Sequence, residues 1–186
     1  MQLPERLSSG SEAARRGFRT IADIGRYRIC KVIEAQPSNG AASGDLCDDH
    51  ASSQALRAFC LGHSNVRRWS GIGEKNADAY ATQLDAFSDT LVDNWQPEDV
   101  IWEVALREGY SLTSRVEQMS APNSKFWQIT DPDRGQSFII CLEPSINLDE
   151  VAALGLTREH VFVCRDTALD DTLASNLALQ CRLKVL

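Results

Sequence analysis

The chain has 186 residues, of which 43% are hydrophobic and 24% charged, values that are ordinary for a globular protein with one core. Its net charge of -7 argues against a dedicated nucleic-acid-binding module, which is normally basic. No apolar run approaches the roughly 18 residues of a membrane span, and the first residues lack the apolar core of a signal peptide, so we expect a cytoplasmic protein with reduced cysteines.

The charge is unevenly distributed along the chain. Residues 1–35 contain seven basic and four acidic residues, a net charge of +3, whereas the other 151 residues contain 12 basic and 22 acidic residues, a net charge of -10. If any part of the chain contacts a phosphate backbone, we therefore expect it to be the first.

Two helices are expected in this basic segment. Ser11 is a suitable cap for a short helix that ends at Gly17, and Thr20 opens a longer helix that Pro37 closes. The apolar positions of the longer helix share one face: Ile21, Ile24, Ile29, Val32 and Ile33.

Three cations lie on or beside that apolar face: Arg26, Arg28 and Lys31. They are candidates for contacts with DNA phosphate or with a partner subunit. The alternative is a solvated or salt-bridged helix flank without a binding role.

The composition predicts three parts. Residues 1–36 form the basic helical segment, and residues 37–53 are rich in Gly, Ser, Ala and Asp, which is typical of a linker or loop. Residues 54–186 are then expected to form a C-terminal α/β domain.

The domain is expected to begin with a strand at residues 54–61, ended by Gly62 and followed by a turn at Asn65. Two Cys-x2-His pairs surround this strand, and Cys and His can form a tetrahedral zinc site. The pairs are Cys47 with His50 and Cys60 with His63. The usual finger pairs Cys with Cys, and Cys60 is better explained as a buried residue of the strand, so we assign no metal ligand.

Helices are predicted next at residues 76–92, with an apolar stripe facing the core, and at residues 97–109, where Pro97 occupies the first turn. Residues 125–130 and 136–142 predict two strands joined by a hairpin loop with Asp-Pro and Gly. A short helix capped by Asn147 or Asp149 follows.

The last 27 residues predict a βαβ unit. Residues 161–164 form an apolar run, Asp170 and Asp171 suit a helix N-terminus, and residues 182–186 alternate polar and apolar side chains. We expect Leu183 and Val185 to be fully buried in the sheet. The predicted fold class is therefore α/β, a mixed sheet flanked by helices and ending in a βαβ unit.

Two acids stand out as candidates for chemistry. Asp166 follows a predicted parallel strand, where α/β folds place catalytic acids, although Arg165 and the following helix favour a capping role. Glu103 lies among apolar residues, but a salt bridge to Arg107 at i+4 explains it more simply. We assign no catalytic residue.

Five segments are distributed along nearly the whole chain, from Gln2 to Leu186: QLPE, GFRTIADIGRYRICKVIEA, LRAFCLGHSNVRRW, WQPEDVIWEVALREGYSLTSRVE and VFVCRDTALDDTLASNLALQCRLKVL. They resemble segments of the modification subunits of type III restriction systems, which are adenine-specific DNA methyltransferases. The resemblance implies that the chain is the C-terminal portion of a longer enzyme, beginning just past its cofactor loop. It also implies S-adenosylmethionine as cofactor of the full-length enzyme, a second modification subunit and a restriction subunit as partners, and adenine N6 of DNA as the methylated atom.

The two motifs that carry this chemistry in the family, Phe-x-Gly-x-Gly and Asp-Pro-Pro-Tyr, do not occur in the sequence. The run Asp131-Pro132-Asp133-Arg134 shares only two residues with the second motif, and Gly71-Ile72-Gly73 lacks the aromatic residue of the first. We therefore expect no cofactor-binding residue and no methyl transfer by this chain alone, but a structural, dimerisation or subunit-contact role. The alternatives are a free-standing protein-interaction module and a small hydrolase built around Asp166.

Overall fold

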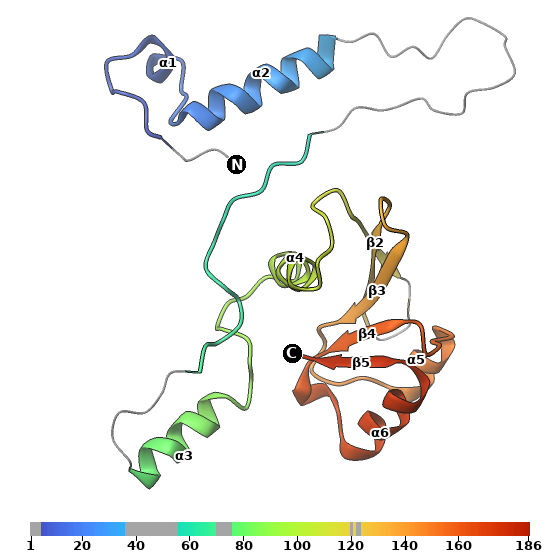
Figure 1. Ribbon diagram of the computed structural model, residues 1–186. Coiled ribbons are helices and arrows are strands. Elements are labelled where there is room, and N and C mark those ends of the chain that lie inside the picture. Colours follow the sequence, from blue (N-terminus) through green and yellow to red (C-terminus); the bar gives the residue numbers. More distant parts are fainter. Residues whose placement is uncertain (1–4, 36–55, 70–75, 120, 122–123) are drawn as a thin grey trace, which may run out of the picture. The chain divides into compact units, whose positions relative to one another are not determined.

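The computed structural model describes residues 5–35, 56–69, 76–119, 121 and 124–186 (Figure 1). The chain divides into two units, Met1–Gly62 and His63–Leu186, and each is described separately below. The predicted linker, residues 37–53, and Gly71-Ile72-Gly73 lie outside the described residues.

The described part of the first unit contains two helices, α1 (Glu12–Arg15) and α2 (Ile21–Ala35). The Ser11 hydroxyl accepts the Ala14 amide at 3.2 Å and caps α1. Thr20 and Asp23 cap α2 reciprocally. The Thr20 hydroxyl accepts the Asp23 amide at 3.1 Å, and the Asp23 carboxylate accepts the Thr20 amide at 3.0 Å. Both helices were predicted, and the structure confirms them.

The first unit has no buried side chain among its described residues. The predicted strand at residues 54–61 is wrong, since residues 56–61 form no secondary structure and residues 54 and 55 lie outside the described part. Cys60, expected to be buried in that strand, is exposed. Leu56, Phe59 and Leu61 are exposed as well, so these apolar side chains are not part of a buried core.

A five-stranded sheet forms the centre of the second unit (Figure 1). In sheet order its strands are β1 (Arg115–Met119), β2 (Phe126–Asp131), β3 (Gln136–Cys141), β4 (Val161–Cys164) and β5 (Arg182–Val185). The first three strands are antiparallel, and β3, β4 and β5 are parallel. The mixed α/β fold and the C-terminal βαβ unit are therefore as predicted.

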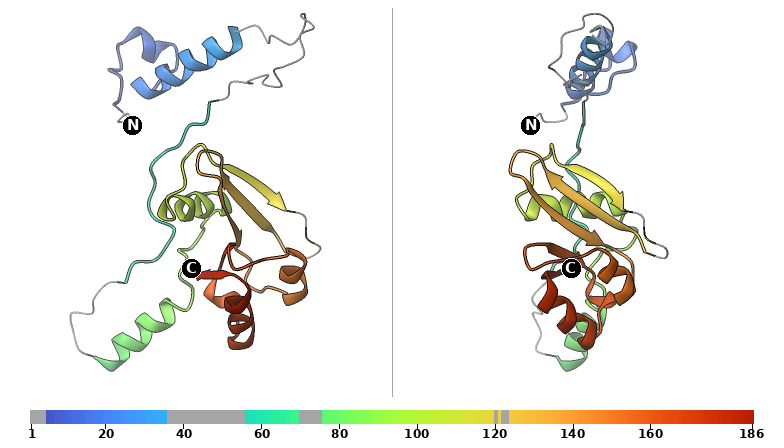
Figure 2. Two further views of the ribbon diagram at one scale, coloured as in Figure 1. Left: turned by 45° about the vertical axis from the view of Figure 1, so that its right-hand side comes forward. Right: turned by 90° about the vertical axis from the view of Figure 1, so that its right-hand side faces the viewer.

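Both faces of the sheet are covered (Figure 2). Alternate residues of a strand point to opposite faces of the sheet. On the first face, Phe138 and Ile140 pack with α4 (Pro97–Arg107). On the second face, Ile139 and Cys141 pack with α5 (Leu148–Ala153) and α6 (Asp171–Gln180). Each parallel crossover carries one helix, and both helices lie on the second face. Phe162, completely buried in β4, contributes roughly 1.5–3 kcal/mol of transfer free energy.

The helix ends follow the predicted capping residues. Pro97 stands at the start of α4. Asn147 caps α5 by accepting the Asp149 amide at 3.0 Å, and Asp170 caps α6 by accepting the Leu173 amide at 2.6 Å.

Two features of the helix predicted at residues 76–92 are wrong. Helix α3 (Ala77–Ala86) ends earlier, and its stripe does not face a core, because Tyr80 is 41% and Leu84 61% exposed. Leu91, expected on the same stripe, has left the helix and pairs with Val66 in an antiparallel bridge, where it is buried.

Strand β5 is at the edge of the sheet, and this changes the burial predicted for it. Leu183 is only partly buried, against the cluster that α5 and α6 cover, and Val185 is 47% exposed. The expectation that both residues are fully buried is therefore wrong, since an edge strand has a neighbour on one side only.

Within the described residues, no helix combines the length and the apolar character that crossing a membrane requires.

Candidate contact surface of helix α2

The three cations proposed for DNA or subunit contact are all exposed on α2. The side chains of Arg26 and Lys31 are 61% and 54% exposed. Exposure is what a contact role requires, but it fits a solvated flank equally well.

Two of the three cations are already paired within the helix. Arg26 Nη2 lies 3.7 Å from Asp23 Oδ1, and Lys31 Nζ lies 2.6 Å from Glu34 Oε2. The hydrogen bond and the charge of Glu34 raise the pKa of Lys31, which keeps it protonated. Among the described residues, Arg28 has no ion-pair partner within 4.0 Å, so it offers an uncompensated charge to a ligand.

Beside these cations, α2 presents an aliphatic stripe, which we define as Ile21, Gly25, Ile29 and Val32. The spacings of four, four and three residues place them on one side of the helix. Ile21 is 40%, Ile29 49% and Val32 59% exposed. Tyr27 lies on another side, where its ring meets that of Phe18 edge-on with 5.3 Å between the centroids. The Tyr27–Phe18 contact is therefore on a different side of α2 from the stripe.

The sequence predicted the helix and its apolar face but not which part of that face stays exposed. Ile24 and Ile33, grouped with the stripe by periodicity, are partly buried. Gly25 was the available signal, because a glycine inside a helix reduces its stability unless another backbone approaches closely.

At the carboxyl end of β4, Asp166 does not form a catalytic arrangement. It is exposed and begins a short 3-10 helix, Asp166–Ala168. Arg165 turns away from it and pairs with Asp89 at 2.7 Å. The N-cap of α6 is Asp170, and not Asp166.

Glu103 has a structural partner other than the one predicted. Its carboxylate accepts the Ser64 hydroxyl at 2.5 Å and the Asn65 amide and side chain at 2.7 and 3.0 Å. Burial raises the pKa of Glu103, but these bonds and the charge of Arg107 together outweigh burial and lower it. The carboxylate therefore fixes the turn at Ser64 and Asn65, and the predicted salt bridge to Arg107 is replaced by these hydrogen bonds.

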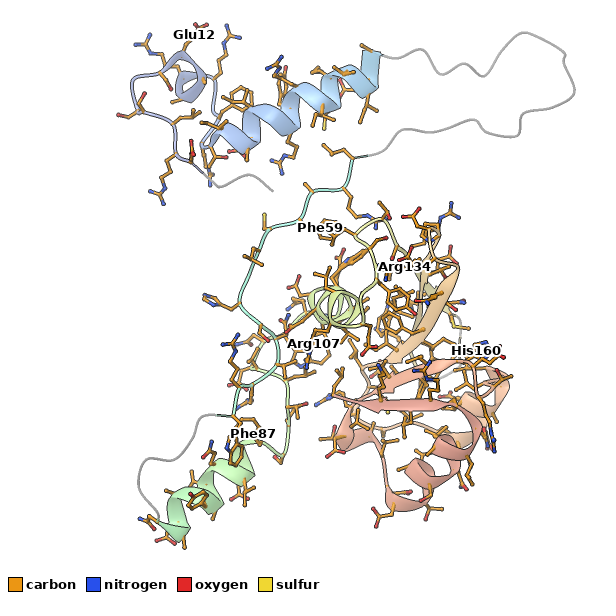
Figure 3. The ribbon with its side chains drawn as sticks, in the orientation of Figure 1. Glu12, Phe59, Phe87, Arg107, Arg134 and His160 are labelled. Carbon is orange, nitrogen blue, oxygen red and sulfur yellow. The ribbon has the colours of Figure 1, made fainter. Side chains whose placement is uncertain are left out.

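The Asp131-Pro132-Asp133-Arg134 run forms the predicted hairpin turn between β2 and β3. Asp131 is buried and accepts the amides of Ser111 and Asp133 at 3.2 and 3.0 Å. Arg134 donates to the Gly109 carbonyl at 2.8 Å (Figure 3). This run therefore anchors the loop between α4 and β1, and it has no arrangement for holding a base.

The zinc hypothesis concerned Cys47, His50, Cys60 and His63. Cys47 and His50 lie outside the described residues, and Cys60 and His63 are exposed. In the part of the chain that the structure describes, no group of three or more His, Cys, Asp or Glu side chains could hold a metal ion.

The second unit has a hollow at the carboxyl ends of β4 and β5, lined by Val66, Val163 and Lys184 among others. Its volume is about 180 Å3, whereas ligand pockets usually measure about 300–1,000 Å3. Lys184 there is paired with Glu108. A larger hollow of about 450 Å3 lies at the N-termini of α5 and α6, lined by Asn147, Asp170 and Leu173 among others. Its volume is within the range of ligand pockets, and the described residues that line it include no glycine-rich loop.

Comparison with protein-family models and with curated proteins finds no match, and no solved structure matches either. A functional assignment must therefore be built on the sequence segments and on the surfaces described above.

Proposed function

We propose that the chain is the C-terminal portion of an adenine-specific DNA methyltransferase of a type III restriction–modification system, acting in the cytoplasm. The observation that carries the proposal is the sequence of resembling segments along nearly the whole chain, from GFRTIADIGRYRICKVIEA to VFVCRDTALDDTLASNLALQCRLKVL. The role of this portion is to contact a second modification subunit, the restriction subunit or DNA.

The chemistry belongs to the rest of the enzyme under this proposal. The sequence has neither Phe-x-Gly-x-Gly nor Asp-Pro-Pro-Tyr, so the chain lacks the residues that hold the cofactor and orient the flipped adenine in the family. Two of its acids that lie within the fold, Asp131 and Glu103, accept backbone amides and fix turns.

The test is the coding sequence upstream of Met1. The proposal expects a continuous reading frame that encodes both motifs. A stop codon in the same frame, with the chain still produced in the cell, would reject it. A second assay mixes the purified chain with the motif-bearing portion and measures transfer of a labelled methyl group to DNA, which should require both.

A free-standing protein-interaction module is the second candidate function. One observation favours it: the described part of the first unit has no buried side chain and presents the aliphatic stripe. The same upstream sequence distinguishes the two candidates, since an interaction module needs no methyltransferase motifs.

A further inference from the structure

We infer that the aliphatic stripe of α2 is a docking site for an acid-flanked amphipathic helix of a partner protein. This inference does not depend on the methyltransferase assignment, because it uses only the exposure and charge of α2. It adds a surface and a partner chemistry to the contact role.

The first step is energetic. Helix α2 has 15 residues and buries none of them. An isolated helix of this length is marginal in water, and proteins stabilise such helices mainly by packing an apolar face. The three large residues of the stripe lie on one side of α2 and are 40–59% exposed, so they still have apolar surface to bury. Tyr27 is exposed as well, but it lies on another side of the helix, where its ring contacts Phe18.

The second step concerns shape. Gly25 lies in the middle of the stripe, between Ile21 and Ile29. A residue without a side chain at this position lets another helix backbone approach closely. The β-branched residues around it have few rotamers, so they lose little entropy on packing. A helix is therefore a better match for the stripe than an irregular loop.

The third step concerns charge. Arg28 is four residues before Val32 in the sequence, so it is a neighbour of Val32 on one border of the stripe. Arg26 is three residues before Ile29, so it is a neighbour of Ile29 on the opposite border. Cations on both borders are complementary to a partner helix with Glu or Asp beside its apolar seam, and at Arg26 a partner carboxylate would compete with Asp23, 3.7 Å away. Arg28 has no described acidic partner of its own, so pairing it costs no existing bond.

The same borders disfavour other occupants. A second copy of α2 would bring the arginines of both copies along one seam, where like charges repel. An anionic membrane would suit the cations, but helices at membrane surfaces place Trp, Phe or Leu in the apolar face, and this stripe has none of them.

The experiment uses the full chain and two synthetic helical peptides of about three heptads, with identical apolar seams. One carries Glu beside the seam and the other carries Lys. We expect the Glu peptide to bind with a low-micromolar Kd that weakens as salt is raised, and the Lys peptide to bind at least tenfold more weakly. Binding is measured by fluorescence anisotropy.

Variants assign the binding to the stripe. Ile29→Gln with Val32→Gln should weaken the Glu peptide at least tenfold, and Arg26→Gln with Arg28→Gln should weaken it and reduce the salt dependence. Leu179→Gln is the matched control, because Leu179 is a leucine of α6 that is 68% exposed and belongs to the other unit. Amide hydrogen exchange over residues 21–35 verifies that α2 remains helical in each variant.

Three results would overturn the inference. The first is no difference between the Glu and Lys peptides while α2 is helical. The second is self-association of the chain that the Ile29 and Val32 substitutions abolish, which would assign the stripe to a second copy. The third is stripe-dependent binding to phosphatidylserine vesicles without binding to the Glu peptide, which would assign it to a membrane surface.

Discussion

Arg165 and Asp89 form an ion pair although 76 residues separate them, with 2.7 Å between Nη2 and Oδ2. The Arg165 side chain is 12% exposed, and its guanidinium carbon lies 5.7 Å from the centre of the Trp95 ring. Asp89 also accepts the Leu91 amide at 3.1 Å. The pair therefore ties the carboxyl end of β4 to the segment that leads into α4.

This geometry predicts a measurable coupling between the two side chains. A double-mutant cycle with Asp89→Ala and Arg165→Met should give about 1 kcal/mol in the free energy of unfolding, measured with urea. That value is at the upper end of the range for exposed pairs, because Arg165 is nearly buried whereas the Asp89 side chain is 43% exposed and solvent screens its charge.

The exposed pair Arg67–Asp93 is the matched control, with 2.9 Å between its atoms and an Asp93 side chain that is 88% exposed. Its coupling should be near the lower end of the range of about 0.2–1 kcal/mol that exposed pairs show. Equal coupling energies for the two pairs would mean that the burial of Arg165 does not strengthen its ion pair with Asp89.

The sequence was sufficient for the C-terminal half of the fold because the signals there are local. The apolar run of β4, the Asp170 cap and the alternation in β5 each depend on neighbouring residues. Strand β1 was not predicted, since it is a polar edge strand in which Arg115, Glu117 and Gln118 are exposed. Its pairing with β2 is visible only in three dimensions.

The errors have a common physical cause. The strand expected at residues 54–61 and the core-facing stripe of α3 were both inferred from apolar residues without knowledge of what they pack against. The candidate site shows the same limit, because periodicity grouped Ile24 with the stripe although Ile24 is partly buried. The exposure of the α2 cations could be predicted, and so could a salt-bridged flank, which the pairs Arg26–Asp23 and Lys31–Glu34 now show. The sequence did not show that Arg28 would have no such pair among the described residues.

Two substitutions in β5 should reduce the free energy of unfolding by different amounts. Leu183 packs against the cluster covered by α5 and α6, so Leu183→Ala should reduce the free energy of unfolding by about 1–2 kcal/mol. Val185 is 47% exposed, and Val185→Ala should cost less than about 0.5 kcal/mol. Urea unfolding of both variants makes the comparison, and a larger loss for Val185→Ala would contradict the placement of β5.

Deleting residues 182–186 should unfold or aggregate the second unit. The deletion removes all the hydrogen bonds between β4 and β5 and leaves the buried strand β4 as an open, apolar edge. A domain's stability is only about 5–15 kcal/mol, so this loss is large. Light scattering and thermal unfolding test it. Deletion of residues 1–9, which belong to the other unit, is the control and should leave the melting of the sheet unchanged.

The described cysteines should differ in their reactivity with thiol reagents. Burial raises the pKa of Cys141 to about 11 and that of Cys164 to about 12, so both remain protonated thiols at pH 8. Cys60 is exposed and should react first. Mass spectrometry after a short maleimide pulse should find label on Cys60 without denaturant and on Cys141 and Cys164 only in urea. Fast labelling of Cys164 in the native chain would contradict its burial in β4.

Asp131 should make the second unit sensitive to acid. Burial raises its pKa, but the backbone amides of Ser111, Asp133 and Arg134 and the charge of Arg134 outweigh burial and lower the pKa below its ordinary value of 3.8. Because the pKa in the folded state is lower than the ordinary value, the stabilisation is fully present above that ordinary value and is lost as pH falls through the folded-state pKa.

Urea unfolding between pH 2.5 and pH 6 should show that the free energy of unfolding falls as the pH is lowered. Asp131→Asn should be less stable than the unchanged chain at pH 6, and its stability should depend less on pH. Asp133→Asn is the control, since Asp133 is exposed and its substitution should leave the pH dependence in place. A parallel pH dependence in the chain and in Asp131→Asn would show that other carboxylates, Glu103 among them, carry the effect.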